Sequence, residues 1–469
     1  MVDRQRTQSF VNDFWEQHIV PPIIEYIRIP NKSPSFDSKW ETAGHMDAAL
    51  KLAKEWIDQH PLPGAKVTID KVPGRTPIIM IDVPGQIDKT VLLYGHLDKQ
   101  PEMTGWREGL GPWIPVREGD KLYGRGGADD GYALFASVCA LKAMHDQGIP
   151  HARAVILIEF SEESGSPDLP FYVDRHQNAI GEVDLVVCLD SGAGNYDQLW
   201  STTSLRGLVG VTLRVDVLTE GVHSGDASGI VPSSFRVLRQ LVSRLEDPET
   251  GTVLPAKLKV EIPQQRVDQA QLAAKSLGDD VFAKFPFLQG MSPMHKDRVQ
   301  LVLNRTWRAA LSYTGQEGMP PLESSGNVLR PYTAVQLSLR LPPTLNGMQA
   351  QNEVARILTE DPPYGAKVSL DFDEPATGWN APELAPWLDE SLTAASEMFY
   401  EKPAVHMGEG GTIPFMGMLG EKFPNAQFVI TGVLGPNSNA HGPNEFLHIG
   451  YAKKLTACVV KILEDHATV

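Results

Sequence analysis

The first two hundred residues alternate short apolar runs with segments of helical periodicity. The runs predict strands buried on both faces, and the periodic segments predict helices, beginning with a mostly helical region over 10–60. Strands separated by helices in this way are typical of a mixed or parallel sheet covered by helices on both faces. The predicted strands are KVTIDKV, TPIIMIDV, TVLLYGHLD, AVILIEFSEES and DLVVCLDSG, and a helix, GYALFASVCALKAMHDQG, is predicted between the third and the fourth of them.

After about residue 203 the pattern changes to alternation of apolar and polar residues, as in LVGVTLRVDVLT, AVQLSLRLPP and AKVSLDFDEPATG. Such alternation predicts half-exposed strands, and two amphipathic segments between them, SSFRVLRQLVSRLED and NEVARILTEDPP, predict helices. The first pattern returns near the end of the chain. We therefore predict an α/β fold in which 1–205 and 379–469 form one domain and 206–378 form an inserted α+β domain.

The composition argues against several kinds of binding partner and site. The 469 residues carry a net charge of −16, from 42 basic and 58 acidic side chains, which argues against binding to nucleic acid or an anionic membrane. No apolar run reaches the roughly 18 residues of a membrane span, and the polar N-terminus lacks the apolar centre of a signal peptide. Three distant cysteines suit neither a disulfide framework nor a thiolate zinc site. We predict a cytoplasmic protein.

Metal-binding or acid–base side chains follow several of the predicted buried strands. Because ligands of helix-covered sheets bind beyond the carboxyl ends of the strands, we expect these side chains to converge. They are His96 and Asp98 after TVLLYG, Asp129 before the long helix, Glu162 and Glu163 after AVILIEF, Asp190 after DLVVCL, and His441 in a loop rich in glycine, proline and asparagine.

Converging carboxylates would repel one another unless a cation neutralised them. Imidazoles and carboxylates without cysteine suit catalytic zinc, or manganese or cobalt in the same site. Two imidazoles and three carboxylates exceed what one catalytic zinc with an open position needs, and they fit two ions bridged by a carboxylate. The alternatives are a surface histidine beside acids for His96 and a solvated helix start for Glu162 and Glu163.

The order GHLD, GRGxxDD, EES, Asp, inserted domain and His resembles the di-zinc metallopeptidase family of carnosinase-type dipeptidases, aminoacylases and succinyl-diaminopimelate desuccinylase. The resemblance covers about residues 15 to 465. It implies a helix-covered mixed-sheet catalytic domain with two divalent metal ions and an inserted lid and dimerisation domain. By this resemblance, His96 and Asp190 bind one metal, Glu163 and His441 the other, Asp129 bridges both, Asp98 orients His96, and Glu162 is the general base.

The resemblance also implies residues that contact the substrate. His223 in GVHSG would reach across a dimer interface to stabilise the oxyanion, although an ordinary turn histidine is the alternative. Arg340 in LSLRLPP would grip a terminal carboxylate, which suits a guanidinium, and Asn327 in SGNVLRP matches a position that contacts substrate.

The glycine-rich loop GEGGTIP, residues 408–414, lacks the GxxxxGK[ST] pattern of a phosphate-binding loop. In the family this loop lines the substrate pocket, which nominates Glu409, Gly411 and Thr412. Glu409 would meet a free α-amino group, which a deacylase substrate does not have.

The predicted function is therefore a two-metal hydrolase that cleaves a peptide bond in small peptides, acting as a homodimer through the inserted domain. GHLDKQP, GW…GPW, LYGRG and EES resemble the carnosinase-type dipeptidases most. An N-acyl- or N-succinyl-amino-acid deacylase is the alternative within the class, and a non-catalytic binding protein on the same fold is the alternative outside it. No GxSxG follows a strand, which disfavours a serine hydrolase.

Overall fold

The computed structural model describes residues 1–411 and 414–469, and the chain forms two compact units. The first unit contains Met1–Thr203, Ala381–His406 and Met418–Val469. The second unit contains Ser204–Asn380 together with Met407–Gly417, so part of the glycine-rich loop belongs to it. The chain therefore leaves the first unit and returns to it twice.

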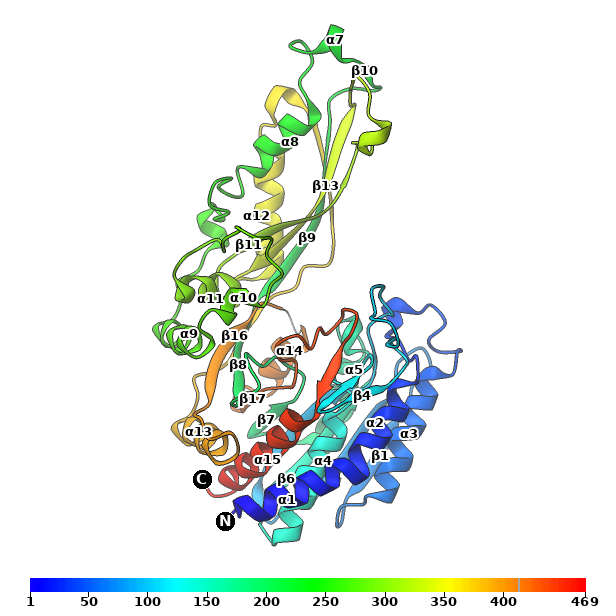
Figure 1. Cartoon of the computed structure of the whole chain (residues 1–469), viewed down its shortest axis with the longest axis vertical. Helices are drawn as coiled ribbons and strands as arrows, with labels where there is room; N and C mark the ends of the chain where they lie inside the picture. The colour runs from blue at the N-terminus through cyan, green and yellow to red at the C-terminus, as the bar shows by residue number, and fades with distance from the viewer. Residues whose placement is uncertain (412–413) are drawn as a thin grey trace. The chain divides into compact units, whose positions relative to one another are not determined.

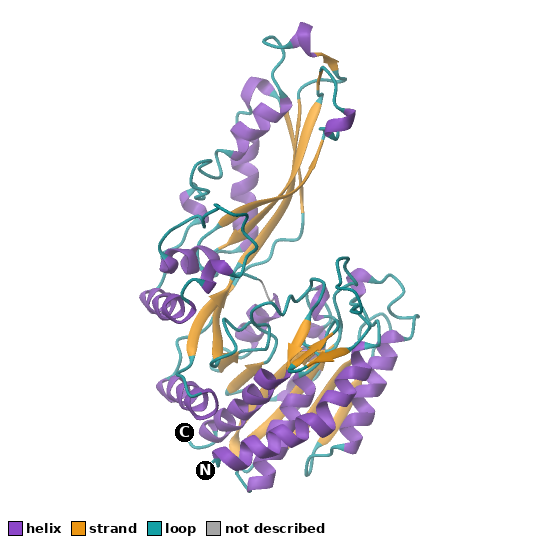
Figure 2. Ribbon diagram, in the orientation of Figure 1, coloured by secondary structure: helices purple, strands orange, loops and turns teal. Residues whose placement is uncertain are grey.

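A six-stranded mixed sheet forms the centre of the first unit, in the order β1-β2-β6-β3-β7-β17. In Figures 1 and 2 it lies behind the helices of this unit. Strands β6, β3, β7 and β17 run parallel to one another, whereas β1 and β2 are antiparallel to their neighbours. The parallel strands are buried on both faces, as their continuous apolar runs predict. The bounds are β1 Lys66–Asp70, β2 Ile78–Val83, β3 Ile87–His96, β6 Ala152–Glu159, β7 Leu185–Cys188 and β17 Gln427–Ile430.

Helices cover this sheet, and α4 is the most deeply buried of them. It packs against β3 and β6 on one side and against α1 and α15 on the other, which explains why its sequence is apolar all round (Figure 1). Gly148, with a φ of 66°, ends α4 in the left-handed conformation that glycine adopts readily. The helices are α1 Arg4–Phe14, α2 Val20–Ile27, α3 His45–Gln59, α4 Ala133–Gln147, α5 Leu169–Arg175, α6 Gln177–Ile180, α13 Pro386–Tyr400, α14 Pro414–Lys422 and α15 Ile449–His466, with a π-helical turn at Trp15–Ile19.

The described residues also form two three-stranded sheets. Their orders are β18-β5-β4 and β15-β8-β16. The bounds are β4 Val116–Glu118, β5 Lys121–Tyr123, β18 Phe446–His448, β8 Trp200–Leu205, β15 Trp379–Asn380 and β16 Val405–Glu409.

The second unit is built on a four-stranded antiparallel sheet in the order β11-β13-β9-β14. Helices α8 and α12 pack on one face of it, so alternate residues of β9 and β13 enter a single apolar core, as the alternating pattern predicts. The strands are β9 Gly207–Asp216, β11 Ala310–Glu317, β13 Tyr332–Leu341 and β14 Lys367–Phe372, with the short β10 Val222–His223 and β12 Val328–Leu329. The helices are α7 Ser224–Ala227, α8 Ser234–Val242, α9 Gln264–Leu277, α10 Asp280–Ala283, α11 Arg298–Thr306 and α12 Gly347–Thr359.

The predicted fold class, a helix-covered mixed sheet with a second α+β unit, is confirmed. The helical prediction for 10–60 is too broad, because residues between α2 and α3 form loops and a short 3₁₀ turn at Pro34–Phe36. Prolines 30 and 34 interrupt the helix there. Among the described residues, no helix combines the length and apolar character that crossing a bilayer requires.

Candidate active site

The buried strand β3 ends at His96, and Asp98 follows two residues later. Parallel pairing places His96 opposite Glu159, the last residue of β6. The 3₁₀ turn after β6 carries Glu162 and Glu163, so the register of two strands brings these acids beside the histidine. Asp190 follows β7, the other neighbour of β3. Three adjacent strands therefore deliver their side chains to one edge of the sheet.

Asp129 reaches the same place from the loop between β5 and α4, just before a cis peptide bond to Asp130. This loop is tightly packed, because a Cβ atom on Gly131 would lie 2.4 Å from both the Gly126 oxygen and the Tyr26 ring. His441 comes from the loop between β17 and β18, with a φ of 63°.

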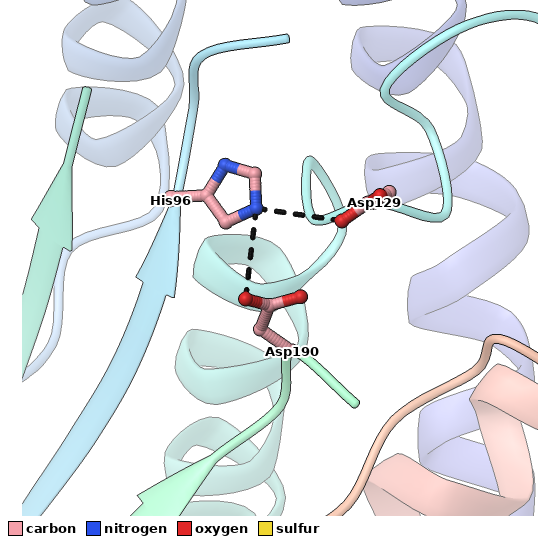
Figure 3. Close-up of side chains that lie close together, drawn as sticks. All are labelled: His96, Asp129 and Asp190. Carbon is pink, nitrogen blue, oxygen red and sulfur yellow. Dashed lines mark ion pairs between the residues drawn. The ribbon is translucent and has the colours of Figure 1, made fainter. Parts of the chain in front are cut away.

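The side chains of His96, Asp129 and Asp190 point toward one another (Figure 3). The Nε2 atom of His96 lies 3.5 Å from Oδ1 of Asp129 and 3.8 Å from Oδ2 of Asp190. One donor atom from each of the three residues lies within 4.8 Å of the others, and all three residues are buried. This group could hold a metal ion.

A second group of three shares Asp129. The Nε2 atom of His441 lies 3.0 Å from Oδ2 of Asp129 and 3.3 Å from Oε2 of Glu163. Asp129 thus turns Oδ1 toward His96 and Oδ2 toward His441. A carboxylate that faces two donor groups with different oxygens has the geometry needed to bridge two metal ions.

Asp98 contacts the His96 ring and the main chain of Glu162 and Glu163. Its Oδ1 atom lies 3.3 Å from Nδ1 of His96, on the side of the ring away from Asp129. Its two oxygens also accept the main-chain N–H groups of Glu162 and Glu163, each at 3.0 Å. Asp98 is fully buried, so it fixes the His96 ring and the turn with one side chain.

The acids at the site resist ionisation in the absence of a cation. Burial, partly offset by His96, raises the pKa of Asp190 to about 7, and the nearby Asp129 adds to the shift. Burial and Asp190 raise the pKa of Glu162, and burial and Asp129 raise that of Glu163. Burial also opposes ionisation of Asp129, but contacts with His441 and His96 outweigh it and lower its pKa. Mutual repulsion is therefore concentrated on the acids around Asp129.

The hydrogen bonding of these residues also indicates that they fit divalent metal ions. Among the described residues, Oε1 of Glu163 is buried without a hydrogen-bond partner, and the ring nitrogens of His96 and Oδ2 of Asp129 lie within ion-pair distance of other site residues but form no hydrogen bond of good geometry. Buried polar atoms in this state are costly, and coordination to a cation would satisfy them. The set of imidazoles and carboxylates suits zinc, manganese or cobalt.

In the second unit, three of the nominated substrate residues surround Arg206. Its main-chain N–H donates to the Gly411 oxygen at 3.0 Å, and its guanidinium is close enough to Arg340 and Glu409 to interact electrostatically. Glu409 accepts from Nη2 of Arg305 at 2.7 Å. Thr412 lies outside the described residues.

His223 and Asn327 lie together at the far end of the same unit. Strands β10 and β12 form a two-stranded ribbon in which His223 pairs with Val328, and Ser224 N–H donates to the Asn327 oxygen at 2.9 Å. This ribbon adjoins the start of β13 (Figure 1), whereas Arg340 is eight residues further along that strand. At about 3.3 Å per residue, roughly 26 Å of strand lies between Tyr332 and Arg340. Within one chain the second unit keeps these two groups of residues apart.

Sequence reasoning missed the ion pair that joins two of the site loops. Arg125, 1% exposed, pairs with the fully buried Glu445, and its Nη2 donates to the Gly442 oxygen beside His441. The sequence did offer a signal for this pair. Arg125 in GRGGADD and Glu445 in HGPNE are oppositely charged residues, and each belongs to a loop that also supplies a predicted ligand. Glu159 was also missed, although a single acid at the end of the apolar run AVILIE is unusual.

The chain is similar to a known family and to several known proteins. The family model described as Peptidase family M20/M25/M40 matches residues 92–465. A cysteinylglycine-S-conjugate dipeptidase of Corynebacterium striatum is 25% identical over 435 residues, which cover 89% of this chain and 88% of that protein. The human β-Ala-His dipeptidase is 26% identical over 359 residues, or 67% of this chain and 69% of that protein.

Solved structures share the fold over the whole chain. Human carnosine dipeptidase 1 superposes with a TM-score of 0.77 at 18% identity, covering 100% of both chains. The Saccharomyces cerevisiae di-peptidase Dug1p has a TM-score of 0.74 at 19% identity, covering 100% of this chain and 99% of that one. Each contains the same overall fold at low sequence identity.

Metal binding at this site should release protons in a pH-dependent way. Because the pKa of Asp190 is raised from 3.8 to about 7, the metal-free protein holds a proton there at pH 6 that a metal must displace. Calorimetric titration with zinc in two buffers of different ionisation enthalpy should detect more proton release at pH 6 than at pH 8. Apparent affinity should fall about tenfold per pH unit below 7 for each proton displaced. Equal proton release at the two pH values would contradict the assignment of Asp190.

Proposed function

The chain belongs to peptidase family M20/M25/M40 and is a metallopeptidase, and from this premise we propose that it is a two-metal dipeptidase. The observation that carries the proposal is the position of Asp129, which faces His96 with one oxygen and His441 with the other. Two ligand groups that share one carboxylate support a pair of ions. Zinc is the proposed metal, with manganese or cobalt as alternatives that suit the same donors.

The metal ions would supply Lewis-acid activation of a water molecule and of the scissile carbonyl. Glu162 is the proposed general base: its Oε2 atom lies 3.9 Å from Nε2 of His96, and it belongs to neither ligand group. Burial and Asp190 raise the pKa of Glu162, which suits a residue that takes a proton from the attacking water and passes it to the leaving amine. Asp98 holds the main chain of Glu162 in place during both transfers.

We propose a small peptide with a free carboxylate as the substrate. The two curated relatives act, by name, on cysteinylglycine S-conjugates and on β-alanyl-histidine. Arg340 would hold the terminal carboxylate, because burial of its guanidinium strengthens pairing with an anion. Gly411 and Thr412 would line the pocket, and Asn327 would contact the substrate.

Glu409 is the proposed partner of a free α-amino group. Arg305 engages Oε2 of this carboxylate, so Oε1 is the atom that would accept from the amine. The same ion pair is the one observation that favours the alternative, an N-acyl- or N-succinyl-amino-acid deacylase, because Arg305 neutralises the charge that would attract an amine. The two functions differ in whether the substrate amine is blocked.

The first test of function is therefore a substrate panel. Protein stripped of metal and reloaded with zinc or manganese should release amino acids from free dipeptides such as cysteinylglycine and β-alanyl-histidine, and should cleave their N-acetyl and N-succinyl forms far more slowly. Cleavage of the N-blocked substrates alone would contradict the dipeptidase proposal and support a deacylase. Metal-free protein is the control, and no metal-dependent cleavage of either series would contradict both functions.

Replacement of the proposed base should separate catalysis from metal binding. Glu162→Gln should keep the metal content of the wild type, while kcat falls about 10²- to 10⁴-fold, because the carboxylate that accepts the proton is lost. Glu163→Gln is the matched control, because this variant removes a proposed metal ligand and should bind metal more weakly than the wild type. If Glu162→Gln loses the metal and Glu163→Gln does not, the two roles are reversed.

We further propose a homodimer in which the second unit of one subunit supplies His223 to the site of its partner. The roughly 26 Å of β13 between the ribbon and Arg340 supports this arrangement, because His223 and the proposed carboxylate reader of one chain lie far apart. His223 is exposed and therefore accessible to a second subunit.

Mixing two inactive variants tests the shared site. Dimers of His223→Ala alone or of Glu162→Ala alone should be nearly inactive. A mixed dimer has one intact site of two, so it should recover up to about half of the activity of a wild-type dimer. Native mass spectrometry would establish that mixed dimers form. Mixed dimers without any recovered activity would place His223 outside the partner's site.

A cytoplasmic location is also proposed. All three cysteines, Cys139, Cys188 and Cys458, are buried as free thiols. Burial raises the pKa of the Cys139 and Cys458 thiols, which makes them unreactive small apolar residues. Free thiols in this state suit a reducing compartment.

A further inference from the structure

The turn that carries Glu162 and Glu163 encloses a carboxylate to which the proposed chemistry gives no task. Glu159 is 1% exposed and accepts hydrogen bonds from three hydroxyl groups. Its Oε1 atom accepts from Tyr94 Oη at 2.6 Å and from Ser166 Oγ at 2.7 Å, and its Oε2 atom accepts from Ser161 Oγ at 3.1 Å. These donors come from strand β3 and from both ends of the turn.

We propose that Glu159 is a positioning residue that sets the conformation of the 161–166 turn and thereby the places of Glu162 and Glu163. The inference rests on the proposed roles of these two glutamates as general base and metal ligand. The residues that donate to the Glu159 side chain, Tyr94, Ser161 and Ser166, are none of the proposed ligands, so Glu159 would act on the site through the turn.

The backbone of the turn needs such support. Three main-chain hydrogen bonds close it: Ser164 and Ser166 N–H groups donate to the Ser161 oxygen, and Gly165 N–H donates to the Glu162 oxygen. Ser166 has a φ of 55°, which is an unfavourable conformation for a residue other than glycine. The hydrogen bond from its hydroxyl to Oε1 of Glu159, at 2.7 Å and shielded from water, holds Ser166 in that conformation.

The turn is thus fixed from two sides. On one side, Asp98 accepts the main-chain N–H groups of Glu162 and Glu163. On the other, Glu159 holds Ser161 and Ser166, the residues that begin and end the turn. The Glu159 side chain also joins this turn to β3, because its Oε1 atom accepts from the hydroxyl of Tyr94 in that strand. Loss of Glu159 should therefore displace Glu162 and Glu163 while leaving their side chains intact.

Asp168 offers a matched control close by in the sequence. It is 9% exposed and accepts from Arg75 Nη1 at 2.7 Å, Thr76 N–H at 2.9 Å and Thr76 Oγ1 at 3.0 Å. Like Glu159, it is a buried carboxylate that accepts from three donor groups, although here they belong to the adjacent residues Arg75 and Thr76. Its partners lie before β2 and not in the turn, so its loss should destabilise the fold without displacing the two glutamates.

The experiment compares Glu159→Ala and Asp168→Ala in the full-length, zinc-reloaded protein. Glu159→Ala should lower kcat about tenfold to a hundredfold and weaken zinc affinity by a similar factor, with KM for a free dipeptide changed less than about threefold. Asp168→Ala should lower the melting temperature while kcat and zinc affinity stay within about twofold of the wild type. Glu159→Gln and Ser166→Ala, which each remove one part of the network, should give smaller losses of the same kind and serve if Glu159→Ala does not fold.

Zinc affinity, measured by competition with a chelating dye, keeps this inference separate from the proposed function. If the wild type cleaves no peptide, the proposed function fails, while the change in zinc affinity still tests Glu159. The inference is overturned if Glu159→Ala keeps both kcat and zinc affinity. It is equally overturned if the Glu159 and Asp168 variants lose both quantities in proportion to their losses of melting temperature.

Discussion

Repulsion among buried carboxylates is the constraint on which the rest of the site depends. Asp129 and Asp190 are buried and Glu162 and Glu163 partly buried at one edge of a sheet, where two imidazoles offset only part of their charge. Asp129 ionises readily because His441 and His96 face it, whereas burial, together with repulsion from Asp129, raises the pKa of Glu163. Cations at the two ligand groups would remove this conflict, which is why the arrangement makes physical sense as a metal centre.

The fold meets this constraint by fixing each carboxylate before any cation arrives. Parallel pairing of β3 with β6 and β7 sets the ends of three strands side by side, so His96, the Glu162 turn and Asp190 begin from rigid positions. The loops that supply Asp129 and His441 have no such strand beneath them, and the buried Arg125–Glu445 pair joins them instead. Each repelling group is held by interactions of its own, and little freedom remains for the groups to move apart.

Much of the fold and of the site could be predicted from the sequence, because the site residues follow directly after the apolar runs that form strands. Apolar runs marked the parallel strands, and each acid or histidine that followed one, such as His96 or Asp190, lies where that rule places it. Glu159 and Glu445 could not be predicted in this way, because their importance comes from partners distant in the chain, Tyr94 and Arg125. The prediction of a mostly helical region over 10–60 did not locate the loop between α2 and α3, which contains Pro30 and Pro34. The pairing of Glu409 with Arg305 likewise depends on a contact across 104 residues.

The most direct test of the central claim is the number of metal ions that each chain binds. Zinc content should be measured by mass spectrometry of the elements after reloading and removal of loosely bound metal, for the wild type and for Asp129→Ala. The shared carboxylate predicts two ions per chain in the wild type and the loss of tight binding at both positions when Asp129 is removed. One ion per chain in the wild type, or two retained ions in Asp129→Ala, would contradict a centre built around Asp129.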